Sequence, residues 1–333
     1  MQIDLIAKEL QSQVFGIKTG KEFEKLALDI YKFQYQNVAV YKAFSDGIHR
    51  NPANVKGLSD IPFLPIEFFK THKVLAKGFS SEIEFTSSGT TGKQTSTHYV
   101  HSLELYRESY TKSFESFYGK QENYAVLALL PSYLEREGSS LIWMVQQMIE
   151  KSKFSESGFF LNNHKDLADM LKYFSVVSKD IILFGVTFAL LDFIEKYSIY
   201  IPQLKIVETG GMKGRRKEMV REEVHAKLQS GFGVDSVHSE YGMTELLSQA
   251  WSLGDGVFQC PPWMKVLIRE TNDPLTLSEK GKSGGINVID FANLYSCSFI
   301  ATQDLGKLHS NDSFEVLGRF DQSDIRGCNL LVL

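Results

Sequence analysis

From Tyr124 onward, unbroken apolar runs alternate with amphipathic stretches of helical periodicity. Runs of strand length without polar alternation are typical of strands that are buried on both faces. Each run is followed by a helical stretch: Tyr124–Leu130 by Leu141–Ile149, Ile181–Phe184 by Phe188–Tyr197, and Leu204–Val207 by Arg215–Leu228. Strands and helices in this order form a parallel sheet with helices on both faces, so the sequence predicts an α/β fold.

The segments on either side of this region have different sequence patterns. Residues from about 3 to 46 show helical periodicity, and the two prolines within 61–70 indicate an irregular apolar connector. After Cys260, short strand-like runs are separated by Gly, Asn and Asp. We therefore expect three segments: a helical N-terminal region packed on the main body (1–80), an α/β core (81–260) and a small β subdomain (261–333).

The composition excludes several classes of protein. Of the 333 residues, 43% are hydrophobic and 23% are charged, which is typical of a globular chain with a large core. The net charge of −4 gives no electrostatic basis for nucleic-acid binding. The N-terminus lacks the pattern of a secretory signal, and the most apolar stretch, Ile181–Ile194, is too short for a membrane span. We expect a cytoplasmic protein with no nucleic-acid partner and no membrane span.

The sharpest local motif combines small hydroxylated residues, two glycines and a lysine. Backbone amides in such a loop can approach an anion closely, and the lysine adds a positive charge, so the composition predicts a phosphate loop. Its members are Thr86, Ser87, Ser88, Gly89, Thr90, Thr91, Gly92 and Lys93. It is not a Walker A loop, because Ser87 stands where that pattern needs glycine. A surface turn is the alternative.

A second motif follows a strand-like run at 238–245. Tyr241 could stack on a base, Gly242 allows a tight turn, and Thr244 with Glu245 offers hard oxygen ligands for Mg2+ near phosphates. The alternative is a glycine-containing turn from a strand into a helix.

Two further residues suit a nucleotide sugar. The Asp304 carboxylate could accept from a pair of ribose hydroxyls, and the Arg319 guanidinium could donate to hydroxyl or phosphate oxygens. Taken alone, such residues are more often a turn acid or a solvated arginine.

The order of these motifs, with a Gly-Gly turn at Gly210 and Gly211, resembles the adenylate-forming superfamily of acyl-CoA synthetases, luciferase and peptide-synthetase adenylation domains. The resemblance implies that residues 86–93 hold the phosphates of ATP and that Gly210 and Gly211 with Tyr241 flank the adenine. It also implies that Glu245 contacts Mg2+ and that Asp304 and Arg319 bind the ribose. The expected fold is the N-terminal domain of that superfamily, in which 81–260 binds nucleotide and acyl group and 261–333 completes the site.

One departure from the superfamily is informative. Most members continue, after the Gly-Arg-x-Asp turn, into a mobile lid domain with a catalytic lysine, whereas this sequence ends twelve residues after Asp321. We therefore expect the lid to be absent. The sequence is most similar to the acyl-protein synthetases of the bacterial luminescence fatty-acid reductase, which are equally short and share the apolar connector of 61–70. In that family a cysteine near the C-terminus receives the activated acyl group.

Cys328 matches that cysteine, and the nearby Arg326 could favour its thiolate. The alternative is a small residue that fills a terminal strand. Cys260 and Cys297 lie in apolar or aromatic contexts, and we expect them to be filler. The pair His98 and His101 has no third ligand at metal spacing and predicts ordinary polar roles.

The predicted activity is ATP-dependent activation of a carboxylic acid, expected to be a fatty acid, as an acyl-adenylate. Lys93, Glu245 and Cys328 are the predicted catalytic residues, with ATP and Mg2+ as cofactors and an acyl-accepting protein as partner. Two alternatives stay open. One is direct acyl transfer to a small thiol, amine or alcohol, with Cys328 structural; the other is a non-catalytic nucleotide-binding subunit.

Overall fold

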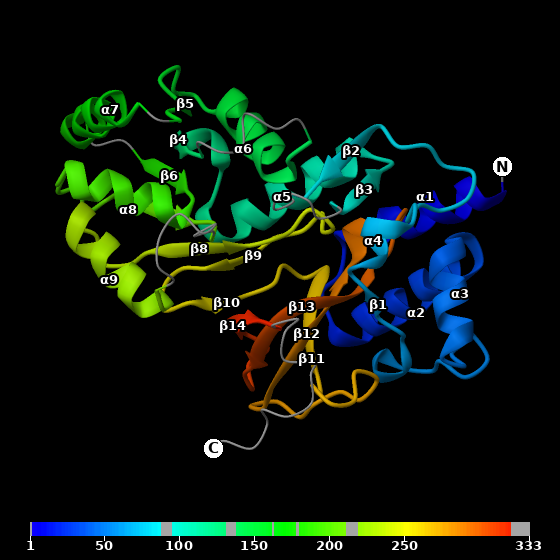
Figure 1. Ribbon diagram of the computed structural model, residues 1–333. Coiled ribbons are helices and arrows are strands. Elements are labelled where there is room, and N and C mark those ends of the chain that lie inside the picture. Colours follow the sequence, from blue (N-terminus) through cyan, green and yellow to red (C-terminus); the bar gives the residue numbers. More distant parts are fainter. Residues whose placement is uncertain are drawn as a thin grey trace. The chain divides into compact units, whose positions relative to one another are not determined.

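A computed structural model describes residues 2–87, 95–130, 138–161, 163–177, 180–210 and 219–320 (Figure 1). The chain divides into two compact units. One unit contains residues 80–261, and the other combines the distant segments 1–79 and 262–333. The first and third segments expected from the sequence are therefore parts of one unit.

The unit of residues 80–261 is built on a sheet with the strand order β5-β4-β6-β7-β8-β9. Its strands are β4 (Ala125–Leu129), β5 (Gly158–Phe159), β6 (Ile181–Gly185), β7 (Lys205–Glu208), β8 (His238–Tyr241) and β9 (Ala250–Ser252). The strands from β5 to β8 pair in parallel, and β9 is antiparallel to β8. All residues of β4 and β6 are buried, as their unbroken apolar sequence predicts.

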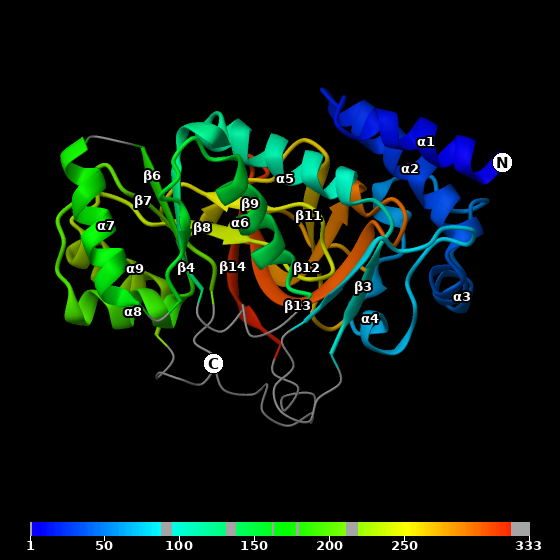
Figure 2. The same ribbon diagram turned by 90° about the horizontal axis from the view of Figure 1, so that it is seen from above.

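Helices cover both faces of this sheet (Figure 2). They are α5 (Leu103–Tyr118), α6 (Ser140–Lys151), α7 (His164–Val177), α8 (Thr187–Lys196) and α9 (Arg221–Phe232). Adjacent residues of β8 contact opposite layers: the His238 ring stacks on Tyr118 of α5, whereas Ser239 lies 3.5 Å from His225 of α9. The described part of the helix predicted at Arg215–Leu228 begins only at Arg221, and residues 215–218 lie outside the described ranges.

A β-hairpin of β2 (Ile83–Thr86) and β3 (Thr97–Val100) precedes α5 in the same unit. The sequence analysis did not predict it. The short elements η2 (Gln121–Asn123) and β10 (Val257–Phe258) complete the described secondary structure of this unit.

The other unit contains an antiparallel sheet in the order β14-β13-β12-β11. Its strands are β11 (Met264–Arg269), β12 (Ser283–Asp290), β13 (Phe299–Leu308) and β14 (Phe314–Arg319), all predicted as short strand-like runs. The apolar connector is more regular than expected, because β1 (Leu64–Pro65) pairs in parallel with β13, Leu64 opposite Ile300.

Helices from the N-terminal segment complete this unit: α1 (Gln2–Val14), α2 (Gly20–Asn37), α3 (Ala39–Gly47) and α4 (Phe68–Thr71), with η1 (Leu58–Asp60) and η3 (Phe291–Asn293). A capping box of Thr19 and Glu22 starts α2. The buried Gln34 of α2 donates to the carbonyls of Asn293 and Leu294 at 3.1 and 2.9 Å. This amide therefore joins the two distant segments in one core. Among the described helices, none is long and apolar enough to cross a membrane.

Candidate functional site

Hydrogen bonds join the two residues that flank the predicted phosphate loop. The Ser87 amide donates to the Ser96 carbonyl at 3.0 Å, and the Ser96 amide donates to the Ser87 hydroxyl oxygen at 2.9 Å. Thr86 is the last residue of β2, and its amide donates to the Gly138 carbonyl at 2.7 Å. The predicted loop residues Ser88, Gly89, Thr90, Thr91, Gly92 and Lys93 lie outside the described residues. The described part of this motif is therefore a closed neck at the end of a hairpin.

The second motif begins at the carboxyl end of β8. Tyr241 is the last residue of that strand; it is buried, and its ring lies edge-on to Phe258 at a centroid distance of 5.9 Å. Gly242 and Thr244 are partly exposed, and the Glu245 carboxylate is buried. The segment turns back toward β9, with the Leu246 amide donating to the Met243 carbonyl at 3.0 Å. The alternative of a strand-to-helix turn is therefore wrong.

His98 connects these two motifs. This residue of β3 is fully buried, and its Nδ1 donates to the Thr244 carbonyl at 3.0 Å. Burial lowers the pKa of His98 to about 4, so the imidazole is neutral at physiological pH. This partly buried hydrogen bond thus joins the hairpin of the predicted phosphate loop to the segment that carries Glu245. The sequence analysis gave His98 only an ordinary polar role, and no local pattern indicates its partner.

Gly210 lies in a turn at the carboxyl end of the neighbouring strand β7. It has φ +75°, a conformation that favours glycine. The buried Glu208 carboxylate accepts from the Gly210 amide at 2.8 Å and from the Thr187 hydroxyl. Burial raises the pKa of Glu208, and these two donors with the charge of Arg221 oppose that effect. Gly211, predicted beside Gly210, lies outside the described residues.

A second acidic residue stands at the end of β8. Burial, together with the charge of Glu208, raises the pKa of Glu240 to about 8. A Cβ atom added to Gly242 would lie 2.2 Å from the Glu240 carboxylate, so a larger residue at position 242 would displace that carboxylate. Sequence reasoning missed both glutamates, because residue type alone does not indicate that a carboxylate is buried.

Asp304 and Arg319 belong to the other unit and face each other across β13 and β14. The Arg319 Nε donates to Asp304 Oδ1 at 3.1 Å; the aspartate side chain is 10% exposed and the arginine side chain 82% exposed. The Asp304 amide donates to the Thr302 hydroxyl oxygen at 3.1 Å, and the buried Arg269 donates to the Thr302 carbonyl at 2.5 Å. The guanidinium of Arg319 is thus accessible and held beside a buried carboxylate.

The cysteines differ in what the structure describes. Cys297 is fully buried, and burial raises the pKa of its thiol to about 12, which agrees with the predicted filler role. Cys260 is partly exposed. Cys328, the predicted acyl acceptor, lies outside the described residues.

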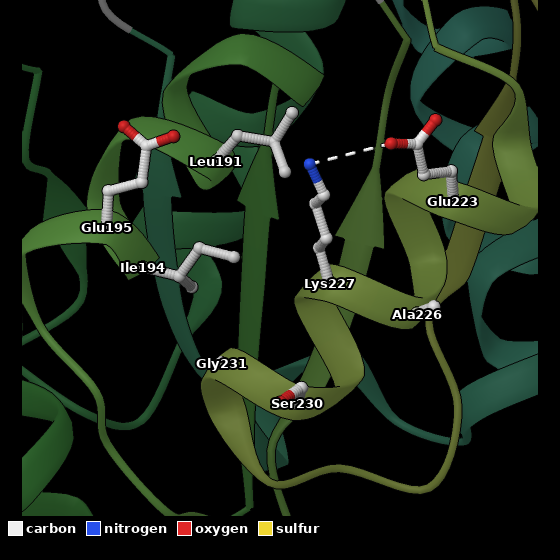
Figure 3. Close-up of a pocket in the computed structure, with 8 residues that line it drawn as sticks. All are labelled: Leu191, Ile194, Glu195, Glu223, Ala226, Lys227, Ser230 and Gly231. Carbon is white, nitrogen blue, oxygen red and sulfur yellow. Dashed lines mark ion pairs between the residues drawn. The ribbon is translucent and has the colours of Figure 1, made fainter.

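A groove between α8 and α9 is lined mainly by apolar atoms, with Leu191 and Ile194 on α8 and Ala226 on α9 (Figure 3). Lys227 beside it pairs with Glu223 at 3.6 Å. None of the predicted site residues that the structure describes lines this groove.

The described site residues of this unit share one structural position. Gly210 follows β7 and Tyr241 ends β8, both at the carboxyl ends of parallel strands, where ligands bind in open α/β sheets. The Thr244 and Glu245 oxygens are of the hard kind that Mg2+ prefers. A glycine turn, the neck of the predicted phosphate loop and the buried Glu245 carboxylate thus belong to a single unit, and their groups are of the kinds that bind phosphates and a hard cation.

Comparison with solved structures shows which fold this is. The chain resembles 2-hydroxyisobutyryl-CoA ligase in complex with 2-HIB-AMP and CoA, with a TM-score of 0.65 and 12% identity over 92% of this chain and 70% of that chain. It also resembles ATP-bound MatB from Rhodopseudomonas palustris, with a TM-score of 0.53 and 14% identity over 71% of this chain and 47% of that chain. It therefore spans about half the length of the MatB chain that it matches.

The fold is therefore that of adenylate-forming ligases. The chain belongs to the acyl-protein synthetase family, LuxE, whose family model matches residues 17–333. The family and the fold class predicted from the sequence are thereby confirmed. Among curated proteins, none matches the chain significantly in sequence.

Proposed function

We propose that this protein activates a carboxylic acid with ATP. A carboxylate oxygen attacks the α-phosphorus of ATP and the bond to pyrophosphate breaks, which yields an acyl-adenylate. The observation that supports this most directly is the His98–Thr244 hydrogen bond, because it places the neck of the phosphate loop against the segment of Glu245 within an adenylate-forming fold. A shared role in holding the phosphates of ATP would explain why the two motifs are joined.

Different groups of residues would bind the phosphates, the adenine and the ribose of ATP. The amides of residues 88–92 and the Lys93 ammonium would neutralise charge on the phosphates, which is the main protein contribution to such reactions. Gly210, Gly211 and Tyr241 would flank the adenine, with Thr86, Ser87 and Gly242 shaping the adjoining loops. Asp304 would accept hydrogen bonds from the ribose hydroxyls, with Arg319 beside it.

The buried Glu245 carboxylate, with the Thr244 hydroxyl, would hold Mg2+, since both groups are hard oxygen donors. When bound, the cation supplies charge neutralisation at the phosphates. The protein's own part is to keep this carboxylate in place before ATP arrives.

We further propose that the acid is a fatty acid and that its acyl group then passes to Cys328. The Cys328 thiolate attacks the carbonyl of the mixed anhydride, a thioester forms and AMP leaves; an acyl-accepting protein partner then takes the acyl group. Membership of the acyl-protein synthetase family supports this transfer. The alternatives are transfer to a small thiol, amine or alcohol, and a nucleotide-binding subunit without turnover. A cytoplasmic location stays a prediction.

The activity is tested by ATP–pyrophosphate exchange with carboxylic acids of increasing chain length. We expect exchange that depends on the acid and on Lys93, so that Lys93→Ala lowers the rate about a hundredfold, whereas Lys120→Ala, an exposed lysine of the same unit, leaves it unchanged. ATP binding without exchange for any acid would indicate the non-catalytic subunit.

The transfer step needs a separate experiment. A radiolabelled acid should give a hydroxylamine-labile protein label that disappears in Cys328→Ser but persists in the matched control Cys260→Ser. Exchange should be normal in both variants. A label unchanged by Cys328→Ser would show that a residue other than Cys328 is acylated, and exchange without any protein label would favour transfer to a small acceptor.

A further inference from the structure

The backbone of the 241–245 segment is held from two sides. On its C-terminal side, α5 provides the anchors: the Ser109 and Ser248 hydroxyls lie 2.9 Å apart, and the Ser113 hydroxyl donates to the Gln249 carbonyl at 3.1 Å. Nearer to the predicted Mg2+ ligands, the His98 Nδ1 donates to the Thr244 carbonyl at 3.0 Å. His98 thus holds the peptide group that directly precedes Glu245.

His98 is itself held firmly in the hairpin. It pairs with Phe85 in the register of β2 and β3, and both side chains are fully buried. The Phe85 ring packs edge-on against Tyr106 of α5 at a centroid distance of 5.6 Å. Two residues before His98, Ser96 closes the neck of the phosphate loop. A shift of the β3 backbone at His98 would therefore also shift the neck of the predicted loop.

We propose that His98 is a positioning residue for adenylation: its Nδ1–H keeps the Thr244–Glu245 peptide aligned with the hairpin that carries the phosphate loop. The proposal rests on the proposed function. His98 is not assigned a contact with ATP or with the acid. Its effect is geometric, and displacements of about 1 Å in such arrangements can cost a hundredfold in rate.

Two substitutions of His98 distinguish the effect of losing the hydrogen bond from the effect of changing the side-chain volume. In His98→Asn the amide Nδ2 can replace Nδ1 as the donor to the Thr244 carbonyl, whereas His98→Leu fills the space without a donor. Leu228→Ala, at a fully buried residue of α9 that belongs to neither motif, is the control for a general loss of stability.

The first readout is the Mg2+ dependence of ATP–pyrophosphate exchange at a temperature where all variants are folded. We expect His98→Leu to lower kcat at least about tenfold and to raise the half-saturating Mg2+ concentration several-fold. His98→Asn should stay within about threefold of the wild type on both measures. Leu228→Ala should lower the melting temperature without a change in the Mg2+ requirement.

The second readout does not depend on activity: amide hydrogen exchange of peptides that cover 242–247. His98→Leu should speed exchange in this segment, and His98→Asn should not. Two results would overturn the positioning role: unchanged hydrogen exchange of residues 242–247 in His98→Leu, or equally large changes in the two readouts in His98→Asn and His98→Leu. If the wild type activates no acid, the proposed function fails, while hydrogen exchange still decides whether His98 holds the segment.

Discussion

The Glu208 carboxylate accepts a hydrogen bond from the Gly210 amide at 2.8 Å and thereby spans the turn that ends β7. Thr187 closes the arrangement from the start of α8: its hydroxyl donates to the same carboxylate oxygen, and its amide donates to the Gly210 carbonyl at 3.3 Å. The turn predicted to flank the adenine is therefore stabilised by the buried Glu208 of β7 and by Thr187 at the start of α8.

Removing this acid tests the turn. Glu208→Ala leaves the Gly210 amide and the Thr187 hydroxyl without their acceptor, so we expect the free energy of unfolding to fall by about 2 kcal/mol. The dissociation constant of ATP should rise about tenfold, because the turn loses its support. Glu208→Gln retains an acceptor oxygen, so its free energy of unfolding and its affinity for ATP should stay close to those of the wild type. Urea unfolding and ATP titration measure them; normal ATP affinity in Glu208→Ala would show that the turn holds without the carboxylate.

The raised pKa of Glu240 predicts how stability depends on pH. Its pKa is about 8 in the folded chain against 4.5 for the ordinary side chain, so between these pH values the folded state binds more protons than the unfolded state. The free energy of unfolding should therefore fall as pH rises from about 4.5 to 8.

Glu240→Gln removes this ionisation. In this variant the free energy of unfolding should depend less steeply on pH. At pH 8 the variant should be more stable than the wild type by about 2 kcal/mol. Urea unfolding at pH 5 and pH 8 gives both values, with Glu115→Gln on the exposed face of α5 as the control. Parallel slopes in Glu240→Gln and the wild type would mean that Glu240 is ionised in the folded state.

The α/β sheet was predictable because its signal is local. β4 and β6 are runs of apolar residues long enough to show that both faces are buried. The hairpin of β2 and β3 was missed although Ile83–Thr86 alternates between apolar and polar residues, because an alternation over only four residues is a weak signal. The joining of 1–79 to 262–333 was equally hidden. It depends on contacts such as Gln34 to Asn293, 259 positions apart in the sequence.

The same limit applies to the site. The motifs of the phosphate loop and of Tyr241–Glu245 could be recognised by residue type and order. His98, Glu208 and Glu240 could not, because their importance comes from burial and from partners on other strands and helices. A histidine or glutamate in isolation has many roles, and only the packing of the sheet selects one.

Gly138 supports the neck of the phosphate loop by its lack of a side chain. Its φ is +89°, and an added Cβ would lie 3.0 Å from the Thr86 hydroxyl oxygen and 3.2 Å from the Glu84 carbonyl. Gly138→Ala should lower the free energy of unfolding by about 1–3 kcal/mol and slow ATP–pyrophosphate exchange.

Gly119 offers a matched control. It has a similar φ of +78°, but an added Cβ would meet no atom within 4 Å. Gly119→Ala therefore has the backbone strain alone, and the difference between the two variants reports the contact with Thr86 and Glu84. Equal exchange rates in the two variants would mean that the neck tolerates this displacement.

The last prediction concerns Asp304 and Arg319 as a ribose-binding pair. Because the Arg319 side chain is 82% exposed, its ion pair should contribute at most about 0.5 kcal/mol to stability. We therefore expect Arg319→Ala to unfold like the wild type but to raise the KM for ATP about tenfold. Asp304→Asn should show a similar rise, since an amide oxygen is a weaker acceptor for ribose hydroxyls than a carboxylate. Arg107→Ala, an arginine of α5 paired with Glu104, serves as the control for losing a surface charge pair.

The decisive comparison is that of ATP with 2′-deoxy-ATP and 3′-deoxy-ATP. If Asp304 accepts hydrogen bonds from the ribose, the wild type discriminates against at least one analogue and Asp304→Asn loses most of that discrimination. Unchanged discrimination in Asp304→Asn would assign the aspartate to holding Arg319 alone.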